Sequence, residues 1–243
     1  IDYYLKSLKL NPTNKYALNN LGTAFKELNK YDEAKKNYLE AISIDSFFSD
    51  AQFNLSLIML AYNNSNPIAW EKYEYRNILT HRYQKILNNK IKKWNGEDLK
   101  NKSIIVFTEQ GIGDTIQFAR YIKLIKKNNT KIIFYTAESL KHLFVKIPEV
   151  DNIITDINNN FRANFYISLM SLPYIFRENN KIEKVNNYLN ISVSKIKYWK
   201  SKLDSNSIKK IGISWKGGES NTDDYKRSIP LVKFSQLFKL ENY

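Results

Sequence analysis

Cysteine is absent from this chain of 243 residues, histidine occurs only twice, and long apolar runs are missing. Without cysteine there can be no disulfide, no thiolate-bound metal and no cysteine nucleophile. The best apolar run, Leu55–Ala61, is far shorter than the roughly 18 residues that a membrane span needs. His81 and His142 lie far apart with no accompanying carboxylate pattern, so we expect surface or packing roles for them rather than catalysis. Because 43% of the residues are hydrophobic and 26% are charged, global disorder is also excluded.

Arginine is scarce too, although the chain carries a formal net charge of +14. Only six of the 38 basic residues are arginines, namely Arg76, Arg82, Arg120, Arg162, Arg177 and Arg227. Proteins that read nucleic acids usually depend on arginine for bidentate and stacking contacts. The lysines are spread along the chain without a concentrated block. We therefore expect a compositional bias and no nucleic-acid partner, with attraction to anionic lipid or to an acidic substrate as the functional alternative.

A repeat opens the chain. Residues 15–46 carry the small and large packing positions of a tetratricopeptide repeat, which has a period of 34 residues. These positions are Leu18, Leu21, Gly22, Phe25, Ala34, Tyr38 and Ala41. A shift by one period makes residues 1–12 the second helix of a cut repeat and residues 49–62 the first helix of a third. Such repeats are binding scaffolds, and a solenoid does not expose a hydrophobic end, so we expect a fragment with further repeats upstream.

The repeat pattern ends at a loop signal in residues 63–67. An aromatic stripe with helical spacing follows over residues 70–76 and contains Trp70, Tyr73 and Arg76. This stripe favours a packing seam between the repeats and the next domain over a ligand site.

Residues 103–122 have the pattern of a buried strand, a glycine turn and a helix. The apolar run 103–107 is typical of a parallel strand, and residues 115–122 have the spacing of an amphipathic helix. This order opens a doubly wound α/β domain, in which ligands bind beyond the carboxyl ends of the strands. Gly111 and Gly113 allow a sharp turn or a close approach to a ligand, although the third glycine of the dinucleotide fingerprint is missing.

Asp114, which follows the second glycine, has two interpretations. With Gln117 it forms a variant of the capping box, in which it satisfies free N–H groups at the start of the helix. Alternatively, a carboxylate at the lip of the cleft takes the proton from an acceptor hydroxyl. The spacing alone favours the cap.

The α/β pattern continues beyond this unit. We expect strands at 131–136, within 148–154 and at 164–168, helices at 138–146 and 195–203, and a loop with a short helix at 169–176. A second strand is predicted at 210–214, followed by a glycine turn and by a helix at 231–240 that has Pro230 at its first position. The turn and the helix start offer Ser214, Trp215, Lys216, Gly217, Arg227 and Ser228. Hydroxyls, cations and free N–H groups could cradle a diphosphate, and a solvated basic loop is the equal alternative.

The order of these parts resembles a known family. The matching motifs are Trp-x-x-Tyr-Glu-x-Arg at 70–76, Trp-Asn-Gly-Glu at 94–97, Glu-Gln-Gly-Ile-Gly-Asp-Thr-Ile-Gln-Phe-Ala-Arg-Tyr at 109–121, Ser-Leu-Pro at 171–173, Gly-Ile-Ser-Trp-Lys-Gly at 212–217 and Arg-Ser-Ile-Pro-Leu at 227–231. With the repeats, they are similar to bacterial tetratricopeptide-repeat proteins that carry a heptosyltransferase-like GT-B glycosyltransferase region. The resemblance covers nearly the whole chain, and the 109–121 block is its most specific part.

This resemblance implies α-helical repeats with a connecting helix at 1–90, followed by α/β structure. Residues 91–205 would be a Rossmann-like N-terminal domain of GT-B type on the acceptor side. Residues 206–243 would be the first, truncated unit of a Rossmann-like donor-side domain. A nucleotide-sugar would then be the donor, with no cofactor and no metal.

The resemblance also assigns roles to single residues. Asp114 would be the catalytic base, which makes this interpretation as strong as the cap. Ser214 and Arg227 would bind the donor phosphates, and heptosyltransferases tend to have lysine where this chain has Arg227. The remaining substrate-binding candidates are Gly111, Gly113, Gln117, Trp215, Lys216, Gly217 and Ser228.

The implied function is transfer of a sugar from a nucleotide-sugar to the hydroxyl of a protein or glycan acceptor, with the repeats recruiting an acceptor or a protein partner. We expect this chain alone to be inactive and its location to be cytoplasmic, or peripheral at the inner face of the membrane. A non-catalytic scaffold for protein–protein interaction is the alternative. Protein O-glycosylation, as in the repeat-bearing O-GlcNAc transferases, ranks lower because their catalytic histidine has no clear counterpart at His81 or His142.

Overall fold

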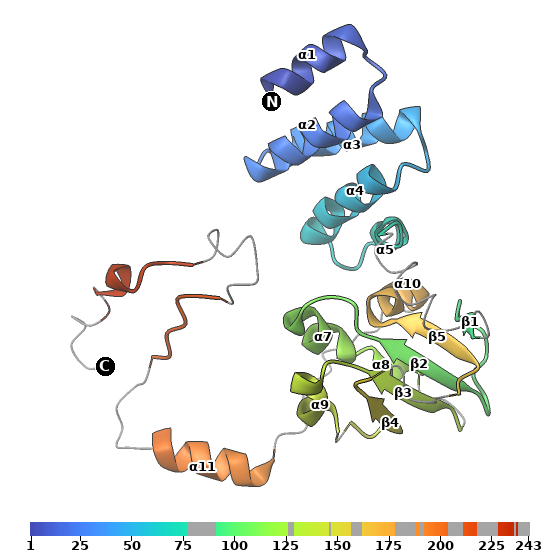
Figure 1. The fold of residues 1–243 in the computed structure, drawn as a ribbon, viewed down its shortest axis with the longest axis vertical. Coiled ribbons are helices and arrows are strands. Elements are labelled where there is room, and N and C mark those ends of the chain that lie inside the picture. The colour runs from blue at the N-terminus through green and yellow to red at the C-terminus, as the bar shows by residue number, and fades with distance from the viewer. Residues whose placement is uncertain are drawn as a thin grey trace. The chain divides into compact units, whose positions relative to one another are not determined.

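The computed structural model describes residues 1–76, 91–125, 129–145, 147–156, 162–177, 188–189, 192–203, 211–217, 228–235 and 237. The chain forms two compact units, residues 1–190 and 191–243 (Figure 1). Among the described helices, none combines the length and the apolar character needed to cross a bilayer.

The first unit begins with helices stacked in series (Figure 1). They are α1 (Asp2–Leu10), α2 (Lys15–Glu27), α3 (Tyr31–Ile44) and α4 (Ser49–Tyr62). Gly22 of α2 shows why the repeat needs a small residue, because a Cβ atom there would lie 2.7 Å from Cε1 of Tyr38. Tyr38 itself is fully buried between the helices. The predicted helical repeats are confirmed, with each helix in its expected range.

Helix α5 (Pro67–Tyr73) joins the repeats to the rest of the unit. It begins at a proline, and the side chain of Asn66 caps it by accepting hydrogen bonds from the N–H groups of Ile68 and Ala69. Trp70 and Tyr73 are buried in the same apolar core as the sheet, and the ring of Trp70 meets that of Phe118 edge-on with centroids 6.0 Å apart. The prediction of a packing seam is therefore confirmed.

A five-stranded parallel sheet follows, so the fold class of helical repeats followed by α/β structure is confirmed. Its strands are β1 (Lys92–Lys93), β2 (Ser103–Phe107), β3 (Lys131–Tyr135), β4 (Asn152–Ile154) and β5 (Phe165–Ser168), in the order β1-β5-β2-β3-β4. The four longer strands lie within the predicted segments. Strand β1 was not predicted, because two residues are too short to carry a periodic pattern.

The turn after β1 contains the Trp94–Glu97 motif. Gly96 has a φ of +104°, a left-handed conformation that favours glycine. The Glu97 side chain accepts from the N–H of Asn95 at 2.7 Å, and the buried indole of Trp94 donates to the Glu97 carbonyl at 2.8 Å. The motif is therefore a compact turn that brings the chain out of the edge strand.

Short helices follow three of the strands. They are α7 (Ile112–Ala119), α8 (Ile122–Ile125), α9 (Glu138–Phe144), the 3-10 turn η2 (Leu169–Ser171) and α10 (Leu172–Ile175). Strand β2 is buried on both faces: Ile104 and Val106 lie in the core with Phe118, while Ile105 and Phe107 lie in a smaller cluster. The residues predicted as a loop at 169–173 instead form η2 and the start of α10, because Pro173 suits a first helical turn.

The strand order changes direction at β2, beside the carboxyl ends of β2 and β5. From β2 the chain moves to β3 and β4 on one side, and it returns to β5 on the other side of β2. In open α/β sheets, ligands bind outside the carboxyl ends of the strands at such a switch point.

The second unit contains α11 (Val193–Leu203), close to the predicted helix at 195–203. Ile211–Ser214 form no strand, so the predicted strand is wrong over its described residues, and Lys210 lies outside them. A 3-10 turn, η5 (Leu231–Phe234), stands at the start of the helix predicted over 231–240, and Pro230 is its N-cap residue rather than its first residue. A parallel strand needs hydrogen-bonded neighbours, and the described residues of this unit provide none.

Candidate functional site at the carboxyl end of β2

The segment after β2 turns directly into a helix. Gly111 is the N-cap residue of α7 in an extended conformation, and its carbonyl accepts from the N–H and the hydroxyl of Thr115 at 3.0 and 3.1 Å. The helix therefore begins three residues before its predicted start at Thr115. Gly113, which we expected in the turn, lies in the first turn of α7 with open space around it.

Asp114 is the third residue of α7 and is partly exposed. The capping prediction for Asp114 and Gln117 is wrong, because Gly111 occupies the N-cap position. Oδ2 of Asp114 lies 3.5 Å from the position that a Cβ atom of Gly111 would take. The positive end of the helix dipole favours a negative charge in this first turn. Gln117 is exposed on the next turn.

A buried ion pair lies beside this loop. Nε and Nη2 of Arg76 meet Oε1 of Glu109 at 2.9 and 2.8 Å, and the two side chains are only 4% and 2% exposed. The other oxygen, Oε2 of Glu109, is buried without a hydrogen-bond partner among the described residues. Both residues belong to the sequence motifs at 70–76 and 109–121, but sequence reasoning gave neither of them a role. Both residues have polar neighbours in the sequence, such as Glu74 and Gln110, so no local signal pairs them.

Glu74 and two serines complete the cluster. Nη1 of Arg76 donates to Oε1 of Glu74 at 2.6 Å, and Nη2 donates to the hydroxyl of Ser171 at 2.8 Å. The Ser171 hydroxyl in turn donates to Oε2 of Glu74 at 2.9 Å. The hydroxyl of Ser168, at the carboxyl end of β5, lies 3.4 Å from Nη2. The guanidinium thus joins α5 to the carboxyl ends of β2 and β5.

The electrostatics of the cluster follow from its burial. Desolvation raises the pKa of Glu109, and the guanidinium of Arg76 opposes this shift. Burial also raises the pKa of Tyr73, whose hydroxyl accepts a hydrogen bond from Nε2 of Gln110 at 3.0 Å. The charges of Glu109 and Asp114 add to that increase.

The arrangement is suited to proton transfer and to binding of a polar ligand. A partly exposed carboxylate, two exposed glycines and the exposed Gln117 lie on one loop–helix junction at the switch point. Among the described residues, no three His, Asp or Glu side chains are grouped closely enough to hold a metal ion. His142 is exposed in the last turn of α9, as expected for a surface residue, and His81 lies outside the described residues.

The predicted donor loop lies in the second unit. Ser214, Trp215, Lys216 and Gly217 are all exposed, and Ser228 is partly buried. The N–H of Ile229 donates to the carbonyl of Trp215 at 3.0 Å, which brings the residue after Ser228 beside this loop. Arg227 lies outside the described residues, so its proposed contact with phosphate stays a prediction. The four candidates of α7 and its N-cap belong to the first unit.

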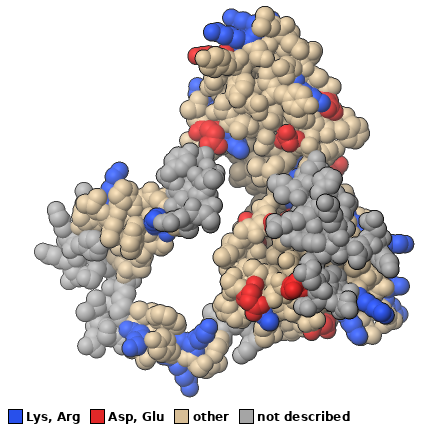
Figure 2. Space-filling model, viewed as in Figure 1, with Lys and Arg blue, Asp and Glu red and all other residues tan. Residues whose placement is uncertain are grey.

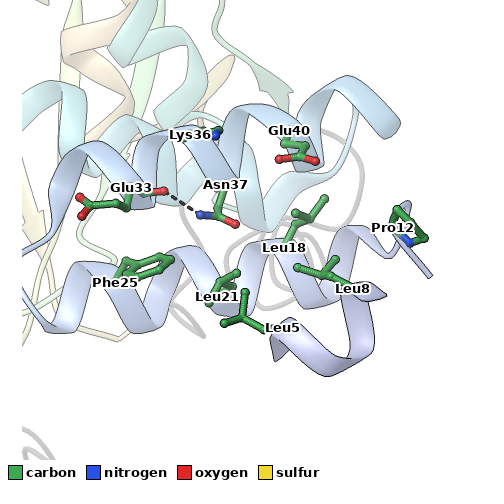
Figure 3. Close-up of a pocket in the computed structure, with 10 residues that line it drawn as sticks. All are labelled: Leu5, Leu8, Pro12, Leu18, Leu21, Phe25, Glu33, Lys36, Asn37 and Glu40. Carbon is green, nitrogen blue, oxygen red and sulfur yellow. Dashed lines mark hydrogen bonds between the residues drawn. The ribbon is translucent and has the colours of Figure 1, made fainter. Parts of the chain in front are cut away.

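The repeats carry a groove of their own. It has a volume of about 370 Å³ and lies between α1, α2 and α3 (Figure 3). Leucines and Phe25 line it, and polar residues of α3 stand along one side, with Nδ2 of Asn37 donating to the carbonyl of Glu33 at 2.8 Å. In the view of Figure 2, basic and acidic residues are both scattered over the surface of the first unit. The groove suits an amphipathic partner.

The comparison with known families agrees with the helical repeats. Residues 3–36 match the tetratricopeptide repeat family. Protein FlbA from Caulobacter vibrioides is 24% identical over 259 residues, a match that covers 95% of this chain and 42% of that protein. The chain thus spans less than half the length of this relative. A mutant O-GlcNAc transferase from Thermobaculum terrenum is 13% identical over 65% of this chain and 37% of its own, with a TM-score of 0.28.

Proposed function

We propose that the protein acts as a glycosyltransferase that moves a sugar from a nucleotide-sugar to an acceptor hydroxyl. The observation that carries the proposal is the position of Asp114. This carboxylate lies partly exposed in the first helical turn beyond β2, at the switch point of a parallel sheet, where ligands of such folds bind. The resemblance of the 109–121 block to the heptosyltransferase-like enzymes supports the same residue.

The proposed reaction is a direct displacement. Asp114 accepts the proton of the acceptor hydroxyl, whose oxygen forms a bond to the anomeric carbon of the sugar. The bond from that carbon to the phosphate oxygen breaks, and its electron pair leaves with the nucleoside diphosphate. Lys216, Arg227 and helix-start N–H groups stabilise the charge of the leaving group, and Ser214 donates a hydrogen bond to it. The step needs no metal.

The remaining candidates surround these groups in the proposal. Gly111 and Gly113 let the acceptor come close to the start of α7, and Gln117 binds it from the next turn. Trp215, Gly217 and Ser228 contact the donor. The activity belongs to the protein at its natural length, and the repeats recruit the acceptor or a protein partner.

Replacement of Asp114 in the natural-length protein tests the proposal. We expect Asp114→Ala to lower transfer at least about 100-fold, the lower end for loss of a general base. The thermal midpoint should stay nearly unchanged, since the described residues give this carboxylate no hydrogen bond. Asp32→Ala is the matched control, because Asp32 is likewise an acidic residue in a first helical turn. Full activity of Asp114→Ala would contradict the proposed base.

The repeat groove favours a second candidate, a non-catalytic scaffold that binds a protein through the repeats. Titration of the natural-length protein with common nucleotide-sugars distinguishes the two functions. Saturable binding that weakens on Lys216→Ala supports the transferase. Absence of binding at millimolar donor supports the scaffold.

A further inference from the structure

Tyr73, at the end of α5, and Arg76, just after it, contact two successive residues of the loop that follows β2. These residues are Gln110 and Glu109. Arg76 contacts Glu109 through Nε and Nη2, at 2.9 and 2.8 Å from Oε1. Three residues earlier, the hydroxyl of Tyr73 accepts the hydrogen bond of Gln110 at 3.0 Å. The loop is therefore held at two adjacent points, by side chains that precede β2 in the sequence.

Tyr73 and Arg76 are themselves held by neighbouring side chains. The guanidinium of Arg76 lies over the ring of Tyr73, 4.6 Å from its centroid. The rings of Trp70 and Phe53 pack against Tyr73 with centroids 5.6 and 5.4 Å away. Since Phe53 belongs to α4, the aromatic contacts continue from the repeats to the loop.

A second layer fixes the direction of the guanidinium. Nη1 of Arg76 donates to Glu74, Nη2 donates to Ser171 as well as to Glu109, and Ser171 donates to Glu74. Lys93 lies 3.4 Å from Glu74 at the exposed edge of the cluster. Two carboxylates and two cations therefore balance in charge, and the planar guanidinium has few alternative orientations.

We propose that Tyr73 and Arg76 are positioning residues: they fix the loop 108–111 and, through Gly111, the first turn of α7 that carries Asp114. In this proposal, the end of α5 and the residues just after it set the geometry of the candidate site. A buried ion pair adds little stability compared with an apolar pair of the same size, because desolvation offsets its attraction. The planar guanidinium does fix the orientation of the carboxylate that it contacts. Orientation matters because a displacement of about 1 Å at a reacting group can lower a rate roughly 100-fold.

The consequence for transfer rests on the proposed function, but the positioning itself does not. Amide hydrogen exchange on the chain measures it without a substrate. The reporter is the N–H of Thr115, which closes the first turn of α7 on the carbonyl of Gly111. The amides of β2 and α2 are the internal references.

Two conservative variants probe the two contacts. Arg76→Lys keeps the charge but loses the planar fork, and we expect Thr115 to exchange at least about tenfold faster relative to β2. Tyr73→Phe keeps the ring, loses the acceptor of Gln110 and should give a relative increase of roughly two- to tenfold. Tyr38→Phe is the matched control, because it removes a buried hydroxyl that lies 3.2 Å from the hydroxyl of Thr23 within the repeats.

The control should leave the ratio of Thr115 to β2 exchange unchanged. The proposal is wrong if Arg76→Lys and Tyr73→Phe accelerate amide exchange at Thr115 and in β2 equally, because the two residues then serve only general stability. It is also wrong if neither variant changes the exchange rate at Thr115. In the natural-length protein, Arg76→Lys should lower kcat about tenfold or more and change the acceptor KM less than twofold. If the wild type transfers no sugar, the proposed function fails, and the exchange ratio still decides the positioning role.

Discussion

Residues 103–119 and 211–234 both combine an apolar run, a glycine turn and a helix-forming segment, but they fold differently. In the first segment, β2 pairs with β3 on one side and with β5 on the other, and its four residues from Ile104 to Phe107 are buried. In the second, Ile211–Ser214 form no strand and Ile211 is 48% exposed. A short apolar run becomes a strand only where a neighbouring strand satisfies its backbone groups.

The surroundings of the two turns differ in the same way. The first turn is held by Arg76 and Tyr73 and continues into a helix with a defined N-cap. The second turn is exposed, with a backbone hydrogen bond from Ile229 to Trp215. Similar local sequence therefore gives a turn held by side-chain contacts in one unit and an exposed turn in the other.

The largest expected effect on the free energy of unfolding comes from replacing an isoleucine in each of the two segments. Ile104→Ala should lower the free energy of unfolding by about 2–5 kcal/mol, because Ile104 is fully buried in β2. Ile211→Ala should change it by less than about 0.5 kcal/mol, as expected of an exposed residue. Urea unfolding of both variants measures the difference. Equal losses would show that residues 211–214 form a buried strand after all.

A smaller effect concerns the buried carboxyl beside the first turn. Because the pKa of Glu109 is raised above its usual 4.5, the native protein keeps a proton that the unfolded chain releases. The unfolding free energy should therefore fall as pH rises from 4.5 through the raised pKa. In Glu109→Gln this part of the pH dependence disappears.

Urea unfolding of wild type and Glu109→Gln between about pH 4 and pH 8 measures this dependence as a difference, so that contributions from other groups cancel. Lys216→Ala, in the exposed second turn, is the control and should follow the wild-type pH profile. A difference that stays constant over the range would contradict the raised pKa.

The smallest expected effect on stability comes from replacing one glycine in each of the two segments. A Cβ atom would meet nothing within 4 Å at either Gly113 or Gly212. Gly113→Ala should stabilise the chain by about 0.5–1 kcal/mol, because position 113 is helical. Gly212→Ala acts mainly through the unfolded state, so its gain should be at most about 0.4–1 kcal/mol.

Ligand titration completes this test. If Gly113 is needed for the close approach of an acceptor, acceptor binding should weaken in Gly113→Ala and stay unchanged in Gly212→Ala. A stabilised Gly113→Ala with unaltered acceptor binding would show that this glycine serves only the backbone.

The local elements could largely be predicted from the sequence. The repeat helices, β2 and the aromatic seam around Trp70 follow from spacing within a few turns, and the structure has them where the spacing placed them. The start of α7 was misplaced, because two glycines allow either an extended or a helical backbone. The candidate roles of Asp114, Lys216 and Arg227 stay predictions.

The sequence by itself determined where the repeat helices lie and which loop carries Asp114, because these features depend on neighbours along the chain. The tertiary structure decided which segments meet. It placed β5 beside β2, whose paired residues Ile104 and Phe165 are far apart in sequence, and it paired Arg76 with Glu109. A sequence pattern predicts that a side chain is buried. Which residue it contacts depends on how distant segments of the chain pack together and exclude water.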